Sequence, residues 1–177
     1  MAQSTGIPKR VIEIPIERCH PDAKLPEYAN LTDSGMDVYA LEDYEILPGE
    51  KKLIPTGLKV AIPNGYELQV RPKSGRALKT WLHIANSPGT IDAGYRDEIG
   101  IIIENLDPPI KDIEYDFNDD GTINIKSILH GAPYEISKGS KFCQLVLMEV
   151  PKCSWREVDK ISDEGDRGGG FGSTGLS

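Results

Sequence analysis

Asp92 and Tyr95 combine a carboxylate with an aromatic ring three residues apart, a pairing that could bind a small molecule. They lie within residues 86–105, NSPGTIDAGYRDEIGIIIEN, which contain a Ser-Pro-Gly turn, an Ala-Gly corner and an apolar run. This pattern predicts a strand, a turn and a returning strand, that is, a β-hairpin. An acid beside a ring on a rigid hairpin tip would suit a small-molecule site. An ordinary loop explains the same residues, so both interpretations stay open at this point.

Two other segments carry groups that suit phosphate recognition. RPKSG at 71–75 opens a predicted helix, so Lys73, the Ser74 hydroxyl and free backbone amides would gather at a helix N-terminus, which attracts anions. The C-terminal stretch GDRGGGFGSTGLS has six glycines in thirteen residues, which would let backbone amides approach phosphate oxygens. Arg167 could neutralise those oxygens and Phe171 could stack on a base. A plain helix cap and a mobile tail are the structural alternatives.

Two further polar residues stand in segments that are predicted to be strands. Asp37 lies in DSGMDVYA, residues 33–40, and Gln144 interrupts the apolar run FCQLVLMEV, residues 142–150. Alternation with a period of two would make Gln144 a solvent-facing strand position. With the segments above, these residues complete five stretches of the types that phosphate and base recognition need.

The elements that must position these groups are mostly strands. Turn signals separate about ten short apolar runs, at intervals of roughly 8–12 residues, which is typical of an all-β sandwich or jelly roll. Residues 54–62 and 66–70 alternate apolar and polar side chains around a Pro-Asn-Gly turn and predict a second hairpin. SGRALKTW at 74–81 is the one predicted helix, and Ser74 could cap it.

Residues 106–135 look like an insertion into a single domain of residues 1–163, which a flexible glycine-rich arm follows at 164–177. Within the insertion, DFNDDG matches the start of an EF-hand calcium loop. Ser127 stands at the twelfth position of that loop, where calcium binding needs Glu. An Asp-Gly hairpin is therefore the favoured interpretation, and a calcium site is the alternative.

Composition excludes several classes of function. The net charge of −8 disfavours direct nucleic-acid binding, because the phosphate backbone repels an acidic surface. The three cysteines form no CxxC pair and the three histidines have no ligand spacing, so a zinc site is not expected. Three unpaired thiols and the lack of a signal peptide predict a cytoplasmic protein. No apolar run is long enough to span a membrane.

Five motifs in one order make the chain resemble the homotrimeric dUTPases (deoxyuridine 5′-triphosphate nucleotidohydrolases). They read DSGMDVYA, RPKSG, NSPGTIDAGYRDEIG, KGSKFCQLV and RGGGFGSTG, and the resemblance covers residues 24–175 apart from 106–135. It implies a jelly-roll subunit and a trimer with three active sites at subunit interfaces. It also implies hydrolysis of dUTP to dUMP and pyrophosphate with Mg²⁺.

By position, the resemblance implies a role for each residue of the candidate site. Asp92 would orient and deprotonate the attacking water, Gln144 would be the second ligand of that water, and Tyr95 would leave no room for a 2′-hydroxyl. Asp37 would touch the water shell of an Mg²⁺ ion that the triphosphate mainly holds. The uracil would be read by Asn86, Gly89, Thr90, Ile91 and Gly100. The phosphates would be bound by Lys73, Ser74 and Gly75. An arm from another subunit would close over the nucleotide with Arg167, Phe171, Gly172, Ser173 and Thr174.

The motifs also depart from the family pattern. Lys73 stands where the family usually has Arg, so it supplies charge without the bidentate fork, and Arg71 could compensate. The fourth motif has Ser140 and Lys141 where relatives usually have Asp-Arg, which predicts that a supporting ion pair is missing. Asp97 stands where many relatives have Gly.

Other functions compete with this interpretation. The dCTP deaminases share the fold, but Ile102 stands where that family places its catalytic Glu. A binding module is a second possibility, with a protein partner at residues 106–135, and this role would add to the enzyme rather than replace it. A purely structural jelly roll does not explain the Arg, Phe, Ser and Thr residues of the arm.

Overall fold

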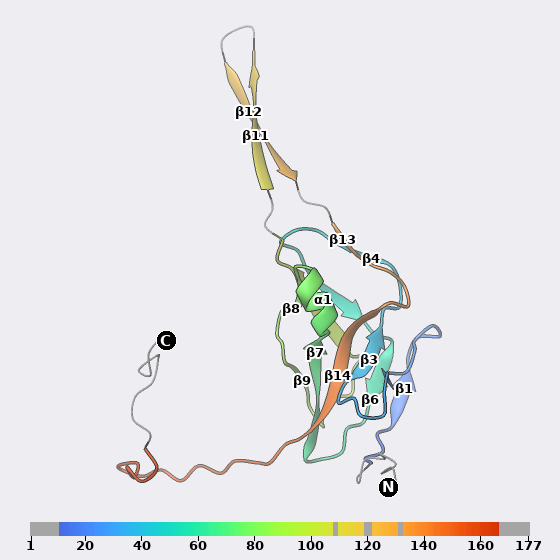
Figure 1. The fold of residues 1–177 in the computed structure, drawn as a ribbon, viewed down its shortest axis with the longest axis vertical. Coiled ribbons are helices and arrows are strands. Elements are labelled where there is room, and N and C mark those ends of the chain that lie inside the picture. The colour runs from blue at the N-terminus through green and yellow to red at the C-terminus, as the bar shows by residue number, and fades with distance from the viewer. Residues whose placement is uncertain (1–10, 108–109, 119–121, 131–132, 167–177) are drawn as a thin grey trace, which may run out of the picture.

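The chain is built almost entirely of strands. The computed structural model describes residues 11–107, 110–118, 122–130 and 133–166. Across these ranges it shows fourteen strands and one helix, α1 (Ser74–Lys79) (Figure 1). The strands are β1 (Ile16–Arg18), β2 (Glu27–Tyr28), β3 (Met36–Tyr39), β4 (Tyr44–Ile46), β5 (Lys51–Pro55), β6 (Leu58–Val60), β7 (Tyr66–Pro72), β8 (Leu82–Ile84), β9 (Gly89–Ile91), β10 (Gly100–Asn105), β11 (Ile110–Phe117), β12 (Ile123–His130), β13 (Tyr134–Ile136) and β14 (Lys141–Glu149). The all-β prediction with one short helix is confirmed for the described residues.

A five-stranded sheet with the order β2-β3-β14-β7-β9 carries most of the candidate site. β14 is its central strand and pairs antiparallel with β3 on one side and with β7 on the other. Leu145 pairs with Val70, and both are buried in the core. Side chains alternate between the two faces of a strand, so Gln144 lies on the opposite face.

A three-stranded sheet with the order β5-β10-β8 closes the other side of the core. Ile101 and Ile103 on β10 are almost fully buried and belong to the same apolar cluster as Leu145 and Val70. Two strand pairs, β1-β6 and β4-β13, complete the jelly-roll-like body. One core therefore fixes both sheets, and the groups of the candidate site stand on this rigid body.

The predicted hairpin at residues 86–105 is wrong. β9 pairs with β7 in the five-stranded sheet, whereas β10 pairs with β5 and β8 in the three-stranded sheet. Residues 92–99 therefore cross from one sheet to the other instead of making a tight turn. Each strand buries apolar side chains, and local sequence shows that a strand is buried without showing which strand lies beside it.

The second predicted hairpin, at residues 54–62 and 66–70, is also wrong. Gly57 has a φ of +69°, and the chain bends there so that β5 and β6 separate. β6 pairs with β1, while β7 pairs with β14 and β9. The helix differs from the prediction at its start, because Lys73 and not Ser74 is the N-cap residue and no side chain caps the helix.

Two segments leave the body. β11 and β12 pair over their whole length and extend away from it as a two-stranded ribbon (Figure 1). The predicted hairpin is thus confirmed in its backbone, while its tip at residues 119–121 lies outside the described residues. After β14 the chain runs outward through residues 150–166, which are almost all exposed and form no helix or strand. In the part of the chain that the structure describes, no helix is long and apolar enough to cross a membrane.

Candidate active site

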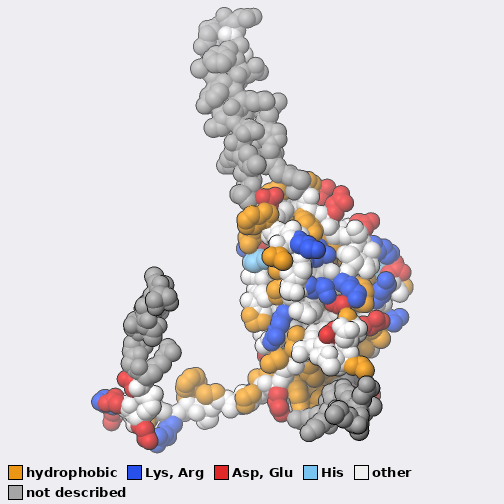
Figure 2. Space-filling model, viewed as in Figure 1, with side chains coloured by type: hydrophobic (Ala, Val, Ile, Leu, Met, Phe, Trp, Pro, Cys, Tyr) orange, Lys and Arg blue, Asp and Glu red, His pale blue; other side chains and the backbone are white. Residues whose placement is uncertain are grey.

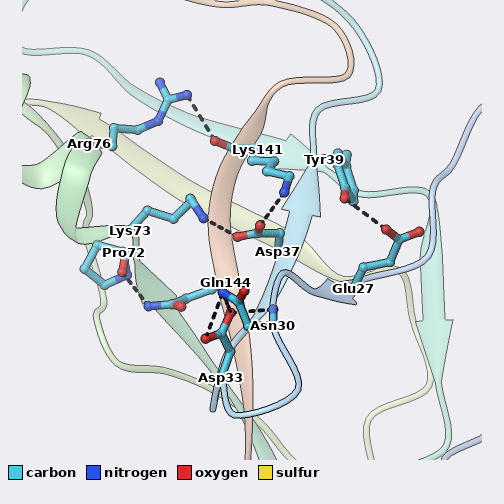
Figure 3. Close-up of polar contacts among 10 residues, drawn as sticks. All are labelled: Glu27, Asn30, Asp33, Asp37, Tyr39, Pro72, Lys73, Arg76, Lys141 and Gln144. Atoms are coloured by element: carbon cyan, nitrogen blue, oxygen red, sulfur yellow. Dashed lines mark hydrogen bonds and ion pairs between the residues drawn. The ribbon is translucent and has the colours of Figure 1, made fainter.

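A buried carboxylate lies between two ammonium groups on the five-stranded sheet (Figure 3). Asp37 on β3 has 6% of its side chain exposed. Lys73, directly before α1, contacts its Oδ1, and the Nζ of Lys141 at the start of β14 lies 2.8 Å from its Oδ2. A buried charge is stable only with such partners, so the three residues form one ion cluster from three elements.

The cluster is cationic at neutral pH. Burial alone would raise the pKa of Asp37, but hydrogen bonds from Lys141 and Lys73 outweigh burial and hold the pKa below its usual range. One carboxylate between two ammonium groups leaves a net positive charge, in a chain whose total charge is −8. Lys and Arg side chains also gather over the middle of the body in the space-filling view (Figure 2). A local cationic surface of this kind attracts phosphate.

The prediction that the fourth motif lacks an ion pair is wrong, because Lys141 pairs with Asp37. The register explains the contact: Gln144 lies opposite Asp37, and the bulge between Lys141 and Cys143 shifts the register at the start of β14. Lys141 is the site residue that sequence reasoning missed. The available signal was a cation at the place where relatives carry Arg, but its partner lies on another strand and is not adjacent in sequence.

The side-chain amide of Gln144 is held in one orientation. Its Nε2 donates to the carbonyl of Pro72 at 3.0 Å (Figure 3), which leaves Oε1 as the acceptor, close to Gly35 just before β3. A Cβ added to Gly35 would overlap this oxygen and lie 2.9 Å from the amide carbon. A larger residue at this position would therefore displace the Gln144 amide from its present orientation. Gln144 is half-buried and hydrogen-bonded, so the alternative of a freely exposed strand position does not apply.

The start of α1 is open to a ligand. Ser74 and Gly75 are exposed, and a side chain at position 75 would meet no atom within 4 Å. Arg71 does not stand in for Lys73. Its Nε and Nη2 donate to Oε1 of Gln69 at 3.0 and 2.6 Å, which directs the guanidinium back along β7. Lys73 is thus the cation that stands at the start of the helix.

Asp92 and Tyr95 lie together in the crossing segment after β9. Asp92 is exposed, and its carbonyl accepts a hydrogen bond from the Tyr95 N–H at 3.1 Å. The Tyr95 hydroxyl donates to the carbonyl of Glu98 at 2.8 Å. The structure therefore brings the predicted acid and ring into one short segment, and it holds the ring through its hydroxyl.

The predicted uracil-reading residues lie at the edge of the five-stranded sheet. β9 is the last strand of that sheet, and an edge strand presents unpaired backbone groups. Within β9, Thr90 is exposed, while Gly89 and Ile91 are buried. A Cβ at Gly89 would lie 3.1 Å from Nδ2 of Asn86, so this amide lies against the strand. Gly100 stands apart at the start of β10, where a Cβ would lie 2.7 Å from Leu53.

Asp92 and Gln144 do not meet within one chain. Ile91 pairs with Leu68 of β7, whereas Gln144 pairs with Arg71 of β7. Three residues along β7 span about 10 Å, and two strand spacings add about 10 Å across the sheet. Both side chains reach only a few ångströms from the backbone, so a single water cannot contact both. The arm residues, which are Arg167, Phe171, Gly172, Ser173 and Thr174, lie outside the described residues.

Comparison with known proteins identifies the family. The family model of dUTPase matches residues 21–119. The chain belongs to the dUTPase family. Deoxyuridine 5′-triphosphate nucleotidohydrolase of Gloeothece citriformis is 38% identical over 167 residues, which cover 94% of this chain and 99% of the relative. The same-named protein of Clostridium tetani is 41% identical over 155 residues, which cover 87% of this chain and 90% of the relative.

Solved dUTPase structures share the fold. The dUTPase of Staphylococcus bacteriophage 80alpha, solved with dUpNHpp, is 30% identical with a TM-score of 0.75, and the match covers 94% of this chain and all of that one. The dUTPase from phage phi11 of S. aureus, described with a species-specific insert, is 30% identical with a TM-score of 0.69. That match covers 85% of this chain and 98% of the phage chain.

Metal-ligating side chains do not cluster in the part of the chain that the structure describes. That part contains no group of three or more His, Cys, Asp or Glu side chains that could hold an ion. Both oxygens of Asp37 are already paired, with Lys73 and Lys141. A contact between Asp37 and the water shell of an ion would therefore compete with both lysines for the carboxylate oxygens. A triphosphate offers the hard oxygen ligands that Mg²⁺ prefers.

Proposed function

We propose that the protein hydrolyses dUTP to dUMP and pyrophosphate through attack of water on the α-phosphorus, which would limit uracil in DNA and supply dUMP. The observation that carries this proposal is the placement of the Gln144 amide beside the cluster of Asp37, Lys73 and Lys141. The Gln144 amide can accept a hydrogen bond from a water molecule, and the lysines beside it can bind phosphate oxygens. The nucleotidohydrolase relatives, which match most of this chain, support the same substrate.

Each residue of the proposed mechanism has a separate task. Asp92 holds and deprotonates the attacking water in line with the α-phosphorus, and Oε1 of Gln144 accepts the second hydrogen bond of that water. Lys73 exchanges Asp37 for a phosphate oxygen, and Ser74 and Gly75 present hydroxyl and amide donors at the start of α1. Lys141 stays on Asp37, so the buried carboxylate keeps a cation throughout.

Backbone groups on the edge strand would select the base. In this proposal the backbone at Thr90 and Ile91 accepts from uracil N3–H and donates to O4, with help from Asn86. The amino group of cytosine would then face a donor and leave polar groups unpaired, and such mismatches give strong rejection. The Tyr95 ring would lie under the deoxyribose and exclude a 2′-hydroxyl.

The separation of Asp92 from Gln144 supports sites that subunits share. We propose a homotrimer in which Asp92 and Tyr95 of one chain complete a site with Lys73 and Gln144 of another. An interface that runs from each chain to the next around a ring repeats the same contact at every site. The arm at residues 164–177 would close over the bound nucleotide and exclude water.

Two apolar surfaces of this chain support the same assembly. A groove of about 870 Å³ lies between residues 11–16 and 25–33 and has Leu68 and Leu145 at its base. Residues 150–166 leave the body as an extended segment (Figure 1). Trp155 on this segment is 92% exposed. Free surfaces of this kind mark interaction sites. In the proposed trimer the extended segment of one copy fills the groove of another.

Mg²⁺ would be the cofactor, held mainly by the triphosphate, with Asp37 near its water shell. When bound, the ion would neutralise the phosphate charge that builds up during attack. We also propose a cytoplasmic setting. Cys19 and Cys153 are exposed free thiols, and burial raises the pKa of Cys143, which keeps that third thiol protonated. Exposed free thiols persist in a reducing compartment.

Pyrophosphate release from dUTP, dCTP, dTTP and UTP in the presence of Mg²⁺ tests the proposed function. We expect turnover of dUTP and at least about 100-fold lower kcat/KM for each of the other three, because each leaves a polar group unpaired or adds a group that clashes. The production of dUTP from dCTP without pyrophosphate release would instead favour a deaminase. Equal turnover of dCTP and dUTP would refute the proposed reading of the base.

The ribbon of β11 and β12 suggests a second role, as a binding surface for a protein partner. Among the described strands, β11 and β12 pair only with each other, and they extend from the body (Figure 1). The phage dUTPases are described as controlling the transfer of virulence genes. Deleting residues 108–132 should leave kcat and KM for dUTP within about two-fold, because the ribbon adds no strand to either sheet of the body. A large loss of hydrolysis in a folded deletion variant would make the ribbon part of the active-site scaffold instead.

A further inference from the structure

Tyr95 is held by groups of its own segment, once through its backbone and once through its side chain. Its backbone N–H donates to the carbonyl of Asp92 at 3.1 Å, and its side-chain hydroxyl donates to the carbonyl of Glu98 at 2.8 Å. Tyr95 as a residue is 39% exposed, so part of it is open to a ligand while its hydroxyl is held. The position of the ring therefore depends on where the Glu98 carbonyl lies.

Glu98 is in turn attached to the core by its own side chain. Its Oε1 accepts a hydrogen bond from the Gly57 N–H at 2.6 Å. Gly57 has a φ of +69°, and a Cβ there would lie 2.8 Å from both His20 and Ala23, so this turn admits glycine alone. A carboxylate that accepts from a backbone N–H makes a strong hydrogen bond. The side chain of Glu98 thus links the Tyr95 segment to a rigid turn of the body.

The next residue strengthens this link. The Ile99 carbonyl accepts from the N–H of Thr56 at 3.1 Å and from its hydroxyl at 2.8 Å, and the Ile99 N–H donates to Leu58 at 2.8 Å. Ile99 and Thr56 are both almost fully buried. These bonds fix the end of the crossing segment at Ile99. The hydrogen bond of the Glu98 side chain adds a second attachment, one residue nearer to Tyr95.

We infer that Glu98 is a positioning residue for sugar selection, which rests on the proposed function and adds a residue to it. A pocket rejects an added hydroxyl only weakly unless its walls are fixed. Positioning groups must be held to within about 0.5 Å to be effective. Glu98 holds the Tyr95 ring in a fixed position in this way. Without the carboxylate, the ring can move and make room for a 2′-hydroxyl.

The test is the ratio of kcat/KM for dUTP to kcat/KM for UTP. We expect Glu98→Ala to lower this ratio at least about ten-fold. The change should come mainly from a higher kcat/KM for UTP, because a loosened Tyr95 ring can move to make room for the 2′-hydroxyl. Glu98→Gln keeps an oxygen that can accept from Gly57 and should stay within about three-fold of the wild type. An unchanged ratio in a folded Glu98→Ala variant, or equal losses in the Ala and Gln variants, would overturn the inference.

Tyr95→Phe provides a second, independent variant that leaves Glu98 in place. It removes the hydroxyl contact, so the dUTP-to-UTP ratio should fall, and adding Glu98→Ala should lower it little further, because both changes break one linkage. Fully additive losses would contradict this linkage. The thermal midpoint of each variant separates local loosening from global destabilisation. A wild-type protein that does not hydrolyse dUTP would refute the proposed function, whereas a selective enzyme with an unaffected ratio in Glu98→Ala would refute only the role of Glu98.

Discussion

Replacing Asp92 with Asn is expected to lower kcat for dUTP by about 10²- to 10⁴-fold, the range that a positioned general base contributes. Asparagine preserves the size of the side chain but cannot accept the proton of the attacking water. Pyrophosphate release at saturating dUTP and Mg²⁺ measures the loss. The affinity for a non-hydrolysable dUTP analogue should change only a few-fold, because the groups that bind base and phosphate are untouched.

Asp97→Asn is the matched control for this loss. Asp97 is an exposed carboxylate in the same crossing segment, and its replacement is the same chemical change at a position with no proposed role. Its kcat should stay within about two-fold of the wild type, as expected for an exposed side chain for which no contact in the site is proposed. A folded Asp92→Asn variant that retains full kcat would show that another group accepts the proton.

Mixing two inactive chains should restore activity. If Asp92 and Gln144 of one site come from different subunits, a trimer assembled from Asp92→Asn chains and Gln144→Ala chains contains some sites with both wild-type residues. Random assembly from equal amounts gives about a quarter of the sites in this state, because a closed ring uses the same contact at each of its interfaces. Co-refolding the two chains and measuring pyrophosphate release per site gives the recovered fraction.

The control for this experiment uses a chain that carries both substitutions. Mixed with Asp92→Asn chains, the doubly substituted chain never supplies a wild-type Asp92, so no activity should return. Native mass spectrometry of trimers with one tagged chain type confirms that the chains have mixed. Mixed trimers of the first kind that remain inactive would place both residues of a site in one subunit and contradict the shared-site proposal.

Sequence alone predicted the fold class, because it depends on short-range patterns, and short motifs likewise supplied the candidate site residues, which stay a prediction. Alternation of apolar and polar residues identifies a strand whichever strand it pairs with. The helix was predicted to within two residues of its observed end. Pairing partners were not predictable in the same way. The apolar sequence of β10 is compatible with either β9 or β5 as its neighbour. The packing of the whole core determines that it pairs with β5.

The contacts of Asp37 show why the electrostatics of the site also escaped prediction. Lys73 and Lys141 are 36 and 104 residues away in sequence, yet both reach the same carboxylate. Their meeting depends on β14 lying between β3 and β7, which is a property of the sheet order. The link from Glu98 to Gly57 has the same origin, because it joins two turns that no sequence pattern connects. Long-range pairing of this kind is set by the closed core, so a local motif can name one residue of a contact without identifying its partner.

The ion pair between Lys73 and Asp37 also bears on how the products leave. In the proposed mechanism, Asp37 is an internal competitor that takes Lys73 back when the phosphates depart. Binding of the triphosphate is then an exchange of partners, so its net gain in affinity is smaller than that from a lysine free in water. Interactions that hold the substrate as tightly as the transition state do not accelerate the chemical step. Return of Lys73 to Asp37 therefore favours the release of pyrophosphate. Product release is the rate-limiting step in many efficient enzymes.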